Sequence, residues 1–476
     1  MSDIDLSIVD RQTAELWAGL VPVLSEYIAI PALSPGFDAD WAANGHLERA
    51  VDLIVLWCRD RPIPGMTVSV HRLEGRTPVV ICEIPATAGA EDAAPVLLYG
   101  HFDKQPEMDG WRNGLGPWKP VLEGDRLYGR GGADDGYSPF AALGAIEAAQ
   151  AAGGAHPRCV VLIEGSEESG SPDLPAYMEA LADVIGTPQL IVCLDSGAAD
   201  YEHLWITTSL RGMAAGNLTV RVVEEGLHSG GYGGFVPDGF RILRRLLERI
   251  EDSEDGRVLL PEAWVEVPPE LEAALARVAE RVGAGRVGEA PLSPGVEPVT
   301  GDDPVEAMLA TTWRPQLTVV GQDGLPPTAR AGNVLRPETT LGISLRIPPH
   351  VDPEVVLLAL EGTLTTDPPH GAQVTFSAGS GAWGWAAPPT APWLEATLQS
   401  ASHRFFGAPS LQFGEGGTIP FMAMLGQRFP GTQFLVTGVL GPESNAHGPN
   451  EFIDLPTARK ITAAVASVLH AAAQPH

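Results

Sequence analysis

The sequence of 476 residues has few basic side chains and no long apolar run. Lys and Arg number 30 against 60 Asp and Glu, and the net charge of −30 argues against a nucleic-acid or anionic-membrane partner. No apolar stretch approaches the ~20 residues of a membrane span, and the N-terminus lacks the basic and then apolar pattern of a secretory signal. We therefore expect a soluble, cytoplasmic protein that binds neither nucleic acid nor membrane.

Cysteine is also scarce. The four cysteines, Cys58, Cys82, Cys159 and Cys193, are widely spaced and form no C-x-x-C pair. This spacing argues against a disulfide framework and against a cysteine-based zinc site. We expect all four to be buried as small apolar residues in a reducing compartment.

Short apolar runs alternate with helix-like stretches in the first 200 residues and again near the C-terminus. Continuous rather than alternating apolar strands, separated by helices, predict an α/β fold with a mainly parallel sheet covered by helices on both faces. Ligands in such folds bind at the carboxyl ends of the strands. The strand-like runs begin at Pro78, Pro95, Arg158, Gln189 and Gln433.

From about residue 210 the pattern changes to strand, helix, strand, strand, helix and strand. This order is typical of a ferredoxin-like α+β domain. A Pro-rich and acidic stretch at 253–313 interrupts it and is interpreted as an insertion. We therefore predict a discontinuous catalytic domain, 1–209 and 386–476, with an inserted lid or dimerisation domain at 210–385.

Acidic and histidine residues follow the predicted strands of the first domain. In "LLYGHFDKQP", "IEGSEESGSP" and "VCLDSG" they come directly after an apolar strand, in "YGRGGADDGYSP" they stand in a Gly-rich loop before a helix, and in "TGVLGPESNAHGPNEF" a histidine follows the last strand. Imidazole with carboxylate is a ligand set suited to zinc, with manganese or cobalt as alternatives. The candidate residues are His101, Asp103, Asp134, Asp135, Glu167, Glu168, Asp195 and His447.

A site for two metals balances the charge of these residues. If Asp134 bridges two divalent ions, three carboxylates and a bridging hydroxide offset four positive charges, with Glu168 and Asp195 as the other carboxylates. His101 and His447 then add one neutral ligand each. Glu167 is left beside a ligand, where a general base is needed. Asp103 follows His101 closely enough to accept its second ring N–H.

Each feature also has a simpler explanation. A single histidine after a strand is often a surface or capping residue, a Glu-Glu pair is usually a solvated loop, and "GRGGADDG" is compatible with a turn and a helix cap. As a nucleotide-binding loop it lacks both the Walker form and a dinucleotide fingerprint. The occurrence of ligand-type residues in five separate loops favours the metal site.

With these motifs, the sequence resembles the dizinc metallopeptidases that include carnosinase and cytosolic dipeptidase, aminoacylase, glutamate carboxypeptidase and succinyl-diaminopimelate desuccinylase. The resemblance covers essentially the whole chain and is strongest to the carnosinase-like dipeptidases. It implies that His101 and Asp195 hold one metal, that Glu168 and His447 hold the other, and that Asp134 holds both. It further implies that Glu167 is the general base and that Asp103 orients His101.

The resemblance extends to the inserted domain. "EEGLHSGGYGG" places His228 where the family stabilises the tetrahedral oxyanion, in dimeric members from the partner subunit. "ISLRIPP" places Arg346 where carnosinase-like enzymes hold the substrate carboxylate, and Asn333 replaces a threonine that contacts substrate across the dimer. A surface position for Arg346 and a turn position for His228 are the structural alternatives. The remaining residues expected to line the pocket are Glu415, Gly417 and Thr418.

Two further positions depart from the family pattern. Gly136 follows the paired aspartates where lysine is common, and Lys104 stands where an apolar residue is common. Neither change removes a metal ligand or the base. Together with Asn333, they argue against a substrate identical to that of carnosinase.

We therefore expect a metal-dependent amide hydrolase that cleaves dipeptides or short peptides with a water bridging two divalent metals, and Glu167 as base. The expected form is a homodimer through the lid. An N-acyl-amino-acid deacylase or carboxypeptidase is the alternative within the family. A non-catalytic binding protein on this fold is the alternative from another class, and the intact base and ligands argue against it.

Overall fold

The computed structural model describes residues 4–283, 288, 290 and 292–475. The chain divides into two compact units, which are described separately. Unit 1 comprises Met1–Thr208, Ala387–Phe413 and Met424–His476, and unit 2 comprises Ser209–Ala386 and Gly414–Ala423. The sequence prediction had assigned this last segment to the catalytic domain.

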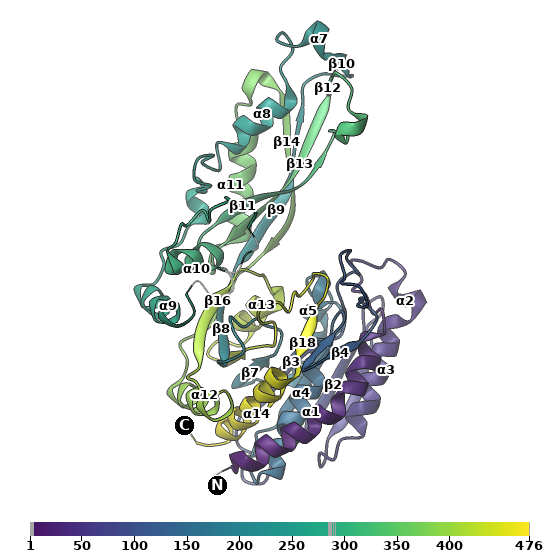
Figure 1. Ribbon diagram of the computed structural model, residues 1–476, viewed down its shortest axis with the longest axis vertical. Coiled ribbons are helices and arrows are strands. Elements are labelled where there is room, and N and C mark those ends of the chain that lie inside the picture. The colour runs from purple at the N-terminus through teal and green to yellow at the C-terminus, as the bar shows by residue number, and fades with distance from the viewer. Residues whose placement is uncertain (1–3, 284–287, 289, 291, 476) are drawn as a thin grey trace. The chain divides into compact units, whose positions relative to one another are not determined.

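Unit 1 is built on a six-stranded sheet of order β1-β2-β6-β3-β7-β17 (Figure 1). The pairs β6–β3, β3–β7 and β7–β17 are parallel, as predicted, whereas β1–β2 and β2–β6 are antiparallel. The connection from β2 to β3 contains no helix, whereas parallel strands need a long crossover between them. The strand β2 therefore runs antiparallel to β3, and so also to β6, which is parallel to β3. The strands of this sheet are β1 (Thr67–His71), β2 (Val79–Ile84), β3 (Val96–His101), β6 (Cys159–Glu164), β7 (Leu190–Cys193) and β17 (Gln433–Val436).

The central strands β3, β6 and β7 are buried at every position, so both faces of the sheet are covered. The helices α1, α4 and α14 pack together in one core cluster (Figure 1). Gly144 in α4 allows this packing, because a Cβ there would lie 2.1 Å from Leu16 Cδ2. The helices of unit 1 are α1 (Leu6–Ile28), α2 (Trp41–Asn44), α3 (His46–Arg59), α4 (Ser138–Ala151), α5 (Leu174–Ala180), α6 (Ala182–Ile185), α12 (Pro392–Phe405) and α14 (Leu455–Ala472).

The chain also contains two three-stranded sheets, and β15 of the second sheet belongs to unit 2. The strands β4 (Val121–Glu123), β5 (Arg126–Tyr128) and β18 (Phe452–Asp454) form a three-stranded sheet. A second small sheet contains β8 (Trp205–Leu210), β15 (Trp385–Ala386) and β16 (Leu411–Glu415), and α13 spans Pro420–Arg428. All four cysteines are buried and free, as expected. Among the helices that the structure describes, none combines the length and apolar character needed to cross a membrane.

Unit 2 contains a four-stranded antiparallel sheet of order β11-β13-β9-β14. With α8 after β9 and α11 after β13, this is the ferredoxin-like order that the sequence predicted. Apolar residues of both helices and alternate residues of the strands form one core, so both helices cover the same face of the sheet (Figure 1). The elements are β9 (Gly212–Arg221), α8 (Gly239–Leu247), β11 (Gln316–Asp323), β13 (Glu338–Ile347), α11 (Pro353–Thr365) and β14 (Gln373–Ala382).

The predicted insertion at 253–313 contains two helices, α9 (Pro269–Val282) and α10 (Pro304–Thr312). Residues 284–287, 289 and 291 of this stretch lie outside the described chain. At the other end of unit 2, β10 (Leu227–His228) pairs with β12 (Val334–Leu335), and α7 (Ser229–Tyr232) follows β10 directly.

Candidate metal centre

The candidate ligands gather at the carboxyl ends of neighbouring parallel strands. His101 is the last residue of β3 and pairs in register with Glu164, the last residue of β6. Glu167 follows β6 within one turn, and Asp195 lies two residues beyond β7. Because β6, β3 and β7 are adjacent, their loops meet at one edge of the sheet.

The His101 ring is fully buried among carboxylates. Its Nε2 lies 3.3 Å from Asp134 Oδ1, 3.7 Å from Asp195 Oδ2 and 3.9 Å from Glu167 Oε2. Within the described chain this nitrogen has no hydrogen-bond partner. The other ring nitrogen, Nδ1, lies 3.1 Å from the main-chain oxygen of Asp103. This contact favours a proton on Nδ1, which leaves Nε2 as the ligand atom.

The carboxylate of Asp134 lies between two histidines. Oδ1 faces His101, and Oδ2 lies 3.0 Å from His447 Nε2. The same His447 atom is 3.3 Å from Glu168 Oε2. Two sets of ligand atoms each lie within 4.8 Å of one another: His101 with Glu167 and Asp195, and His101 with Asp134 and Glu168. Asp134 therefore has one oxygen directed toward each histidine.

The ionisation of this cluster reflects its excess of buried negative charge. Burial raises the pKa of Asp195 to about 8, with a further contribution from Asp134. Burial also raises the pKa of Glu167 well above its usual range. For His447, burial favours the neutral ring, but hydrogen bonds with Asp134 and Glu168 outweigh it and raise the pKa to about 11. Divalent cations would neutralise these carboxylates, and the donor set and the unpaired His101 Nε2 fit such ions.

Asp103 positions the turn that carries both glutamates. Its carboxylate accepts hydrogen bonds from the main-chain N–H of Glu167 at 3.1 Å and of Glu168 at 3.0 Å. Its Oδ1 is 3.5 Å from His101 Nδ1, farther than its own main-chain oxygen. The predicted partner of the ring was the carboxylate, and the structure instead places the main-chain oxygen closer. Asp103 thus contacts His101 and the glutamate turn together.

Three other buried or half-buried residues support the ligands, and the sequence patterns did not identify them. Glu451 accepts hydrogen bonds from Gly131 N at 2.9 Å and pairs with Arg130 at 2.7 Å, which fixes the loop before Asp134. Gln105 Nε2 donates to Glu168 Oε2 at 2.8 Å. Glu164 accepts from three hydroxyl groups around the glutamate turn, those of Tyr99, Ser166 and Ser171. All three residues stand inside the sequence motifs that suggested the site, and this position was the only signal for them.

The two departures from the family pattern have structural causes. A Cβ at Gly136 would lie 2.0 Å from Tyr27 Cε1, so no larger residue fits beside this ring. Lys104 is fully buried, and its Nζ donates to the main-chain oxygens of Tyr27 at 2.8 Å and Ile30 at 2.9 Å. The Lys104 Nζ therefore caps the C-terminus of α1, where the last carbonyls have no partner within the helix.

The remaining predicted site residues belong to unit 2 and form two groups. Arg346 Nη1 donates to Thr418 Oγ1 at 2.7 Å, and Thr418 follows closely on Glu415, the last residue of β16, and on Gly417. His228 and Asn333 lie at the opposite end of the sheet from this pair, in the β10–β12 region. His228 Nδ1 accepts the Gly231 N–H at 3.2 Å, and the main-chain oxygen of Asn333 accepts the Ser229 N–H at 2.9 Å. Both side chains are solvent-accessible.

Comparisons with known proteins agree with the fold and the donor set. Residues 97–471 match the model of Peptidase family M20/M25/M40. A cysteinylglycine-S-conjugate dipeptidase of Corynebacterium striatum is 30% identical over 375 residues, covering 76% of this chain and 78% of that protein. The Cys-Gly metallodipeptidase dug1 of Schizosaccharomyces pombe is 25% identical over 471 residues, covering 94% and 93%.

Solved structures share the architecture at lower identity. The dipeptidase Dug1p of Saccharomyces cerevisiae aligns with a TM-score of 0.78 at 20% identity, covering 99% of both chains. Human carnosine dipeptidase 1 aligns with a TM-score of 0.74 at 22% identity, covering 99% of this chain and 100% of that one. From the family match and the relatives, we conclude that the chain belongs to Peptidase family M20/M25/M40.

Proposed function

We propose that this chain is a dipeptidase that uses two divalent metal ions, with zinc as the expected ion. The observation that supports this most strongly is the Asp134 carboxylate, whose Oδ1 lies 3.3 Å from His101 Nε2 and whose Oδ2 lies 3.0 Å from His447 Nε2. Relatives named for dipeptide hydrolysis, including a Beta-Ala-His dipeptidase of Rattus norvegicus that is 28% identical over 286 residues, support the substrate class. The proposed metal ligands are His101, Asp134, Glu168, Asp195 and His447.

Bound divalent ions would acidify a water molecule and polarise the scissile carbonyl. The chain's own residues would orient the reaction and move the proton. Glu167 is the proposed base, because its carboxylate reaches the first ligand group while Asp103 holds its main-chain N–H at 3.1 Å. Glu167 would take a proton from water and pass it to the leaving amine.

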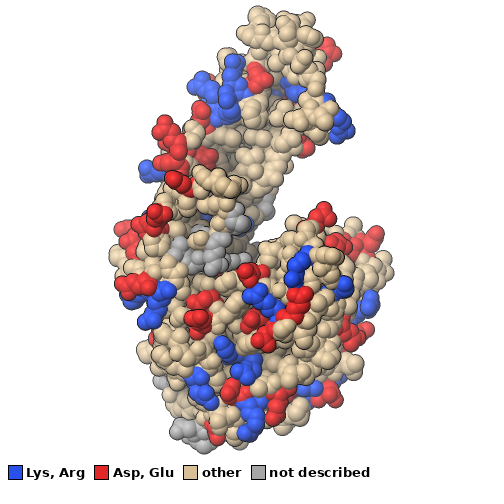
Figure 2. Space-filling model, in the orientation of Figure 1, with Lys and Arg blue, Asp and Glu red and all other residues tan. Residues whose placement is uncertain are grey.

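Unit 2 is proposed to serve as lid and dimerisation domain. The end that carries α7, β10 and β12 has few charged side chains on the face seen in Figure 2. Phe235 there is 90% exposed, and Tyr232 and Val334 are also exposed. An apolar surface of this kind favours a protein partner, and we propose a second copy of the chain. His228 on the same end would then stabilise the oxyanion, and Asn333 would contact substrate.

Arg346 is proposed to hold the substrate carboxylate, with Thr418 orienting its guanidinium and Glu415 and Gly417 lining the pocket. The free, buried cysteines also support a reducing compartment, such as the cytoplasm. Both statements extend the dipeptidase proposal and neither is required for it.

Mass spectrometry of a mixed dipeptide and N-acyl-amino-acid library tests the proposal. The purified protein is stripped with a chelator and then supplied with zinc, manganese or cobalt. Metal-restored cleavage of dipeptides is the expected result. Release of acyl groups alone would assign the chain to the deacylases, and no cleavage with metals bound would contradict an enzymatic role.

A further inference from the structure

Arg211 and Arg346 lie close together at one end of the unit 2 sheet. Arg346 on β13 pairs with Met213 on β9, and Arg211 directly precedes β9, two residues before Met213. The β13 residues on either side of Arg346 face the core with α8 and α11, so Arg346 stands on the face that these helices leave uncovered. Arg346 is near enough to Arg211 to act on its charge.

Thr418 connects the two arginines. Its hydroxyl accepts from Arg346 Nη1 at 2.7 Å and donates to the main-chain oxygen of Arg211 at 2.7 Å. The Arg211 side chain makes only long hydrogen bonds, from Nε to Gly416 O at 3.3 Å and from Nη1 to Ala310 O at 3.4 Å. Within the described chain its Nη2 has no hydrogen-bond partner. Both guanidiniums retain N–H groups for a ligand.

No carboxylate of the described residues lies within ion-pair distance of Arg211 or Arg346, although the chain carries 60 acidic residues. Two other arginines of unit 2 do have such partners, Arg221 with Glu224 at 3.0 Å and Arg314 with Glu306 at 3.2 Å. Arg211 is only 9% exposed, so water compensates its charge poorly. Burial, together with the neighbouring Arg346, lowers the pKa of Arg211 to about 10.

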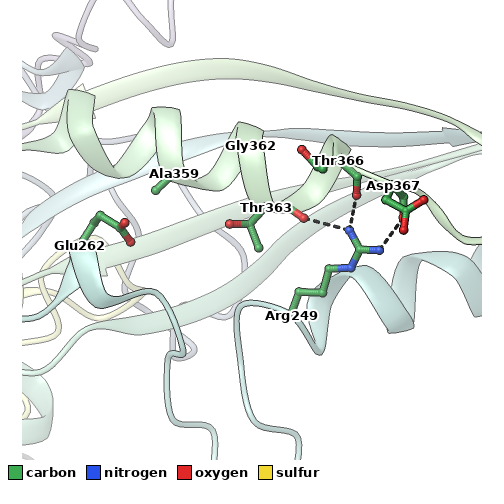
Figure 3. Close-up of a pocket in the computed structure, with 7 residues that line it drawn as sticks. All are labelled: Arg249, Glu262, Ala359, Gly362, Thr363, Thr366 and Asp367. Atoms are coloured by element: carbon green, nitrogen blue, oxygen red, sulfur yellow. Dashed lines mark hydrogen bonds between the residues drawn. The ribbon is translucent and has the colours of Figure 1, made fainter.

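Arg249 shows what a structurally satisfied arginine in this unit looks like. Its guanidinium donates to the main-chain oxygens of Thr363 at 3.0 Å, Thr366 at 2.6 Å and Asp367 at 2.8 Å, at the end of α11 (Figure 3). The pocket around it also contains Glu262. These contacts account for Arg249 as a helix C-cap. Among the described residues, Arg211 has only the two long bonds to Gly416 O and Ala310 O, and Arg346 donates to Thr418 Oγ1 rather than to a carbonyl.

We propose that Arg211 and Arg346 form a subsite for two carboxylates, so that the preferred substrate is a peptide whose C-terminal residue is Asp or Glu. The inference rests on the proposed dipeptidase function. A single α-carboxylate would leave one positive charge uncompensated in a partly buried site, whereas an acidic C-terminal residue supplies two negative charges. Arg346 would bind the α-carboxylate, and Arg211 would bind the side-chain carboxylate.

The test compares kcat/KM for Ala-Glu and Ala-Gln, which differ in charge but hardly in shape. The zinc-loaded enzyme is expected to prefer Ala-Glu by about tenfold or more, because a charge-assisted hydrogen bond is lost with the amide. Equal values would overturn the proposal and leave the dipeptidase function standing. Calorimetric binding of free glutamate against glutamine tests the subsite independently of turnover, and equal affinities would also overturn it.

Matched variants assign the preference to Arg211. R211Q is expected to reduce the Ala-Glu to Ala-Gln ratio about tenfold, and R211K to retain part of it. R221Q changes an arginine at the other end of β9 that Glu224 already neutralises, and should leave the ratio unchanged. An R211Q enzyme that loses both substrates equally would show that the arginines share one carboxylate, contrary to the proposal.

Discussion

Arg130 and Glu451 form a fully buried ion pair at 2.7 Å that joins two distant loops of the metal centre. Arg130 stands four residues before Asp134, and Glu451 stands four residues after His447. Glu451 also accepts the Gly131 N–H at 2.9 Å, and Arg130 Nη2 donates to Gly448 O at 2.8 Å. Contacts within the chain thus fix to each other the two loops that carry the proposed ligands Asp134 and His447.

Replacement of Glu451 by Gln should weaken both the fold and metal binding. The variant leaves Arg130 charged and buried without a counter-ion, and breaking a buried pair in this way costs about 3–5 kcal/mol. Residues that support metal ligands typically contribute 10–100-fold in affinity, and we expect a loss in this range. Urea unfolding and a competitive zinc titration measure the two effects.

E48Q provides the control for this variant. It breaks the Arg72–Glu48 pair of 2.6 Å, whose side chains are 50% and 46% exposed, and should cost no more than about 1 kcal/mol. An E451Q protein with the stability and zinc affinity of E48Q would contradict the role of the buried pair.

Metal binding should release protons near neutral pH. In the metal-free site the pKa of His447 is about 11, and nearby carboxylates also raise the pKa of His101 above its usual range despite its burial. Both rings are therefore protonated at pH 7 and must lose a proton to bind a metal. Calorimetry in buffers of different ionisation enthalpy should detect release of about two protons or more, with affinity rising with pH.

H447A is the informative variant for proton release. It removes one titrating ring and should lower the number of released protons by about one. Zinc affinity that does not change between pH 6 and pH 8 would contradict the ionisation assigned to both histidines.

Glu164 should make the stability of the metal-free protein depend on pH. Burial raises its pKa to about 7, against the opposing hydrogen bond from Tyr99. Between pH 4.5 and 7 the unfolded chain therefore binds fewer protons at this position than the folded chain, and the contribution of Glu164 to stability falls as pH rises. The total change corresponds to about 3 kcal/mol.

Urea unfolding of wild type and E164Q at pH 5 and pH 7 measures this contribution. The stability of wild type relative to E164Q should decrease on going to pH 7. E74Q, at an exposed glutamate, should show no such change. A constant difference between wild type and E164Q would show that Glu164 is ionised in the fold throughout this range.

His228 and the apolar end of unit 2 should affect turnover without affecting the metals. H228A removes the proposed oxyanion donor and should lower kcat by about 100-fold while the metal content stays at the wild-type level.

F235E should dissociate the proposed dimer, as measured by analytical ultracentrifugation, because Phe235 is 90% exposed on that surface. A monomeric wild-type protein or a fully active H228A variant would contradict the proposed role of unit 2.

The donor set could be predicted from the sequence because strand order makes distant loops converge. Apolar strands of continuous character imply a parallel sheet, and the ends of its adjacent strands meet at one edge. His101 is the last residue of such a strand, and Glu167 and Asp195 stand three and two residues after the ends of theirs. The ferredoxin-like order of unit 2 was predictable for a different reason, because each strand and helix has a clear apolar period.

The supporting contacts could not be predicted in the same way. Glu451 and Arg130 are 321 residues apart, and nothing in either local sequence indicates a pair. The role of Lys104, which replaces the apolar residue common at its position, could not be predicted either. Its partners are main-chain oxygens, and the sequence does not show which main-chain groups lie near a side chain. The antiparallel pairing of β2 with β6 follows from the absence of a helix between β2 and β3, and the apolar residues of β2 do not indicate it.

Zinc titration of the metal-free enzyme, with dipeptide hydrolysis and bound zinc followed together, tests the central claim most directly. Wild type is expected to reach full activity at two zinc ions per chain. E167Q is expected to bind the same two ions with nearly all turnover lost, because it lacks the base but keeps every ligand. Full activity at one ion, or loss of zinc from E167Q, would contradict the assignment of two metals and of Glu167 as the base.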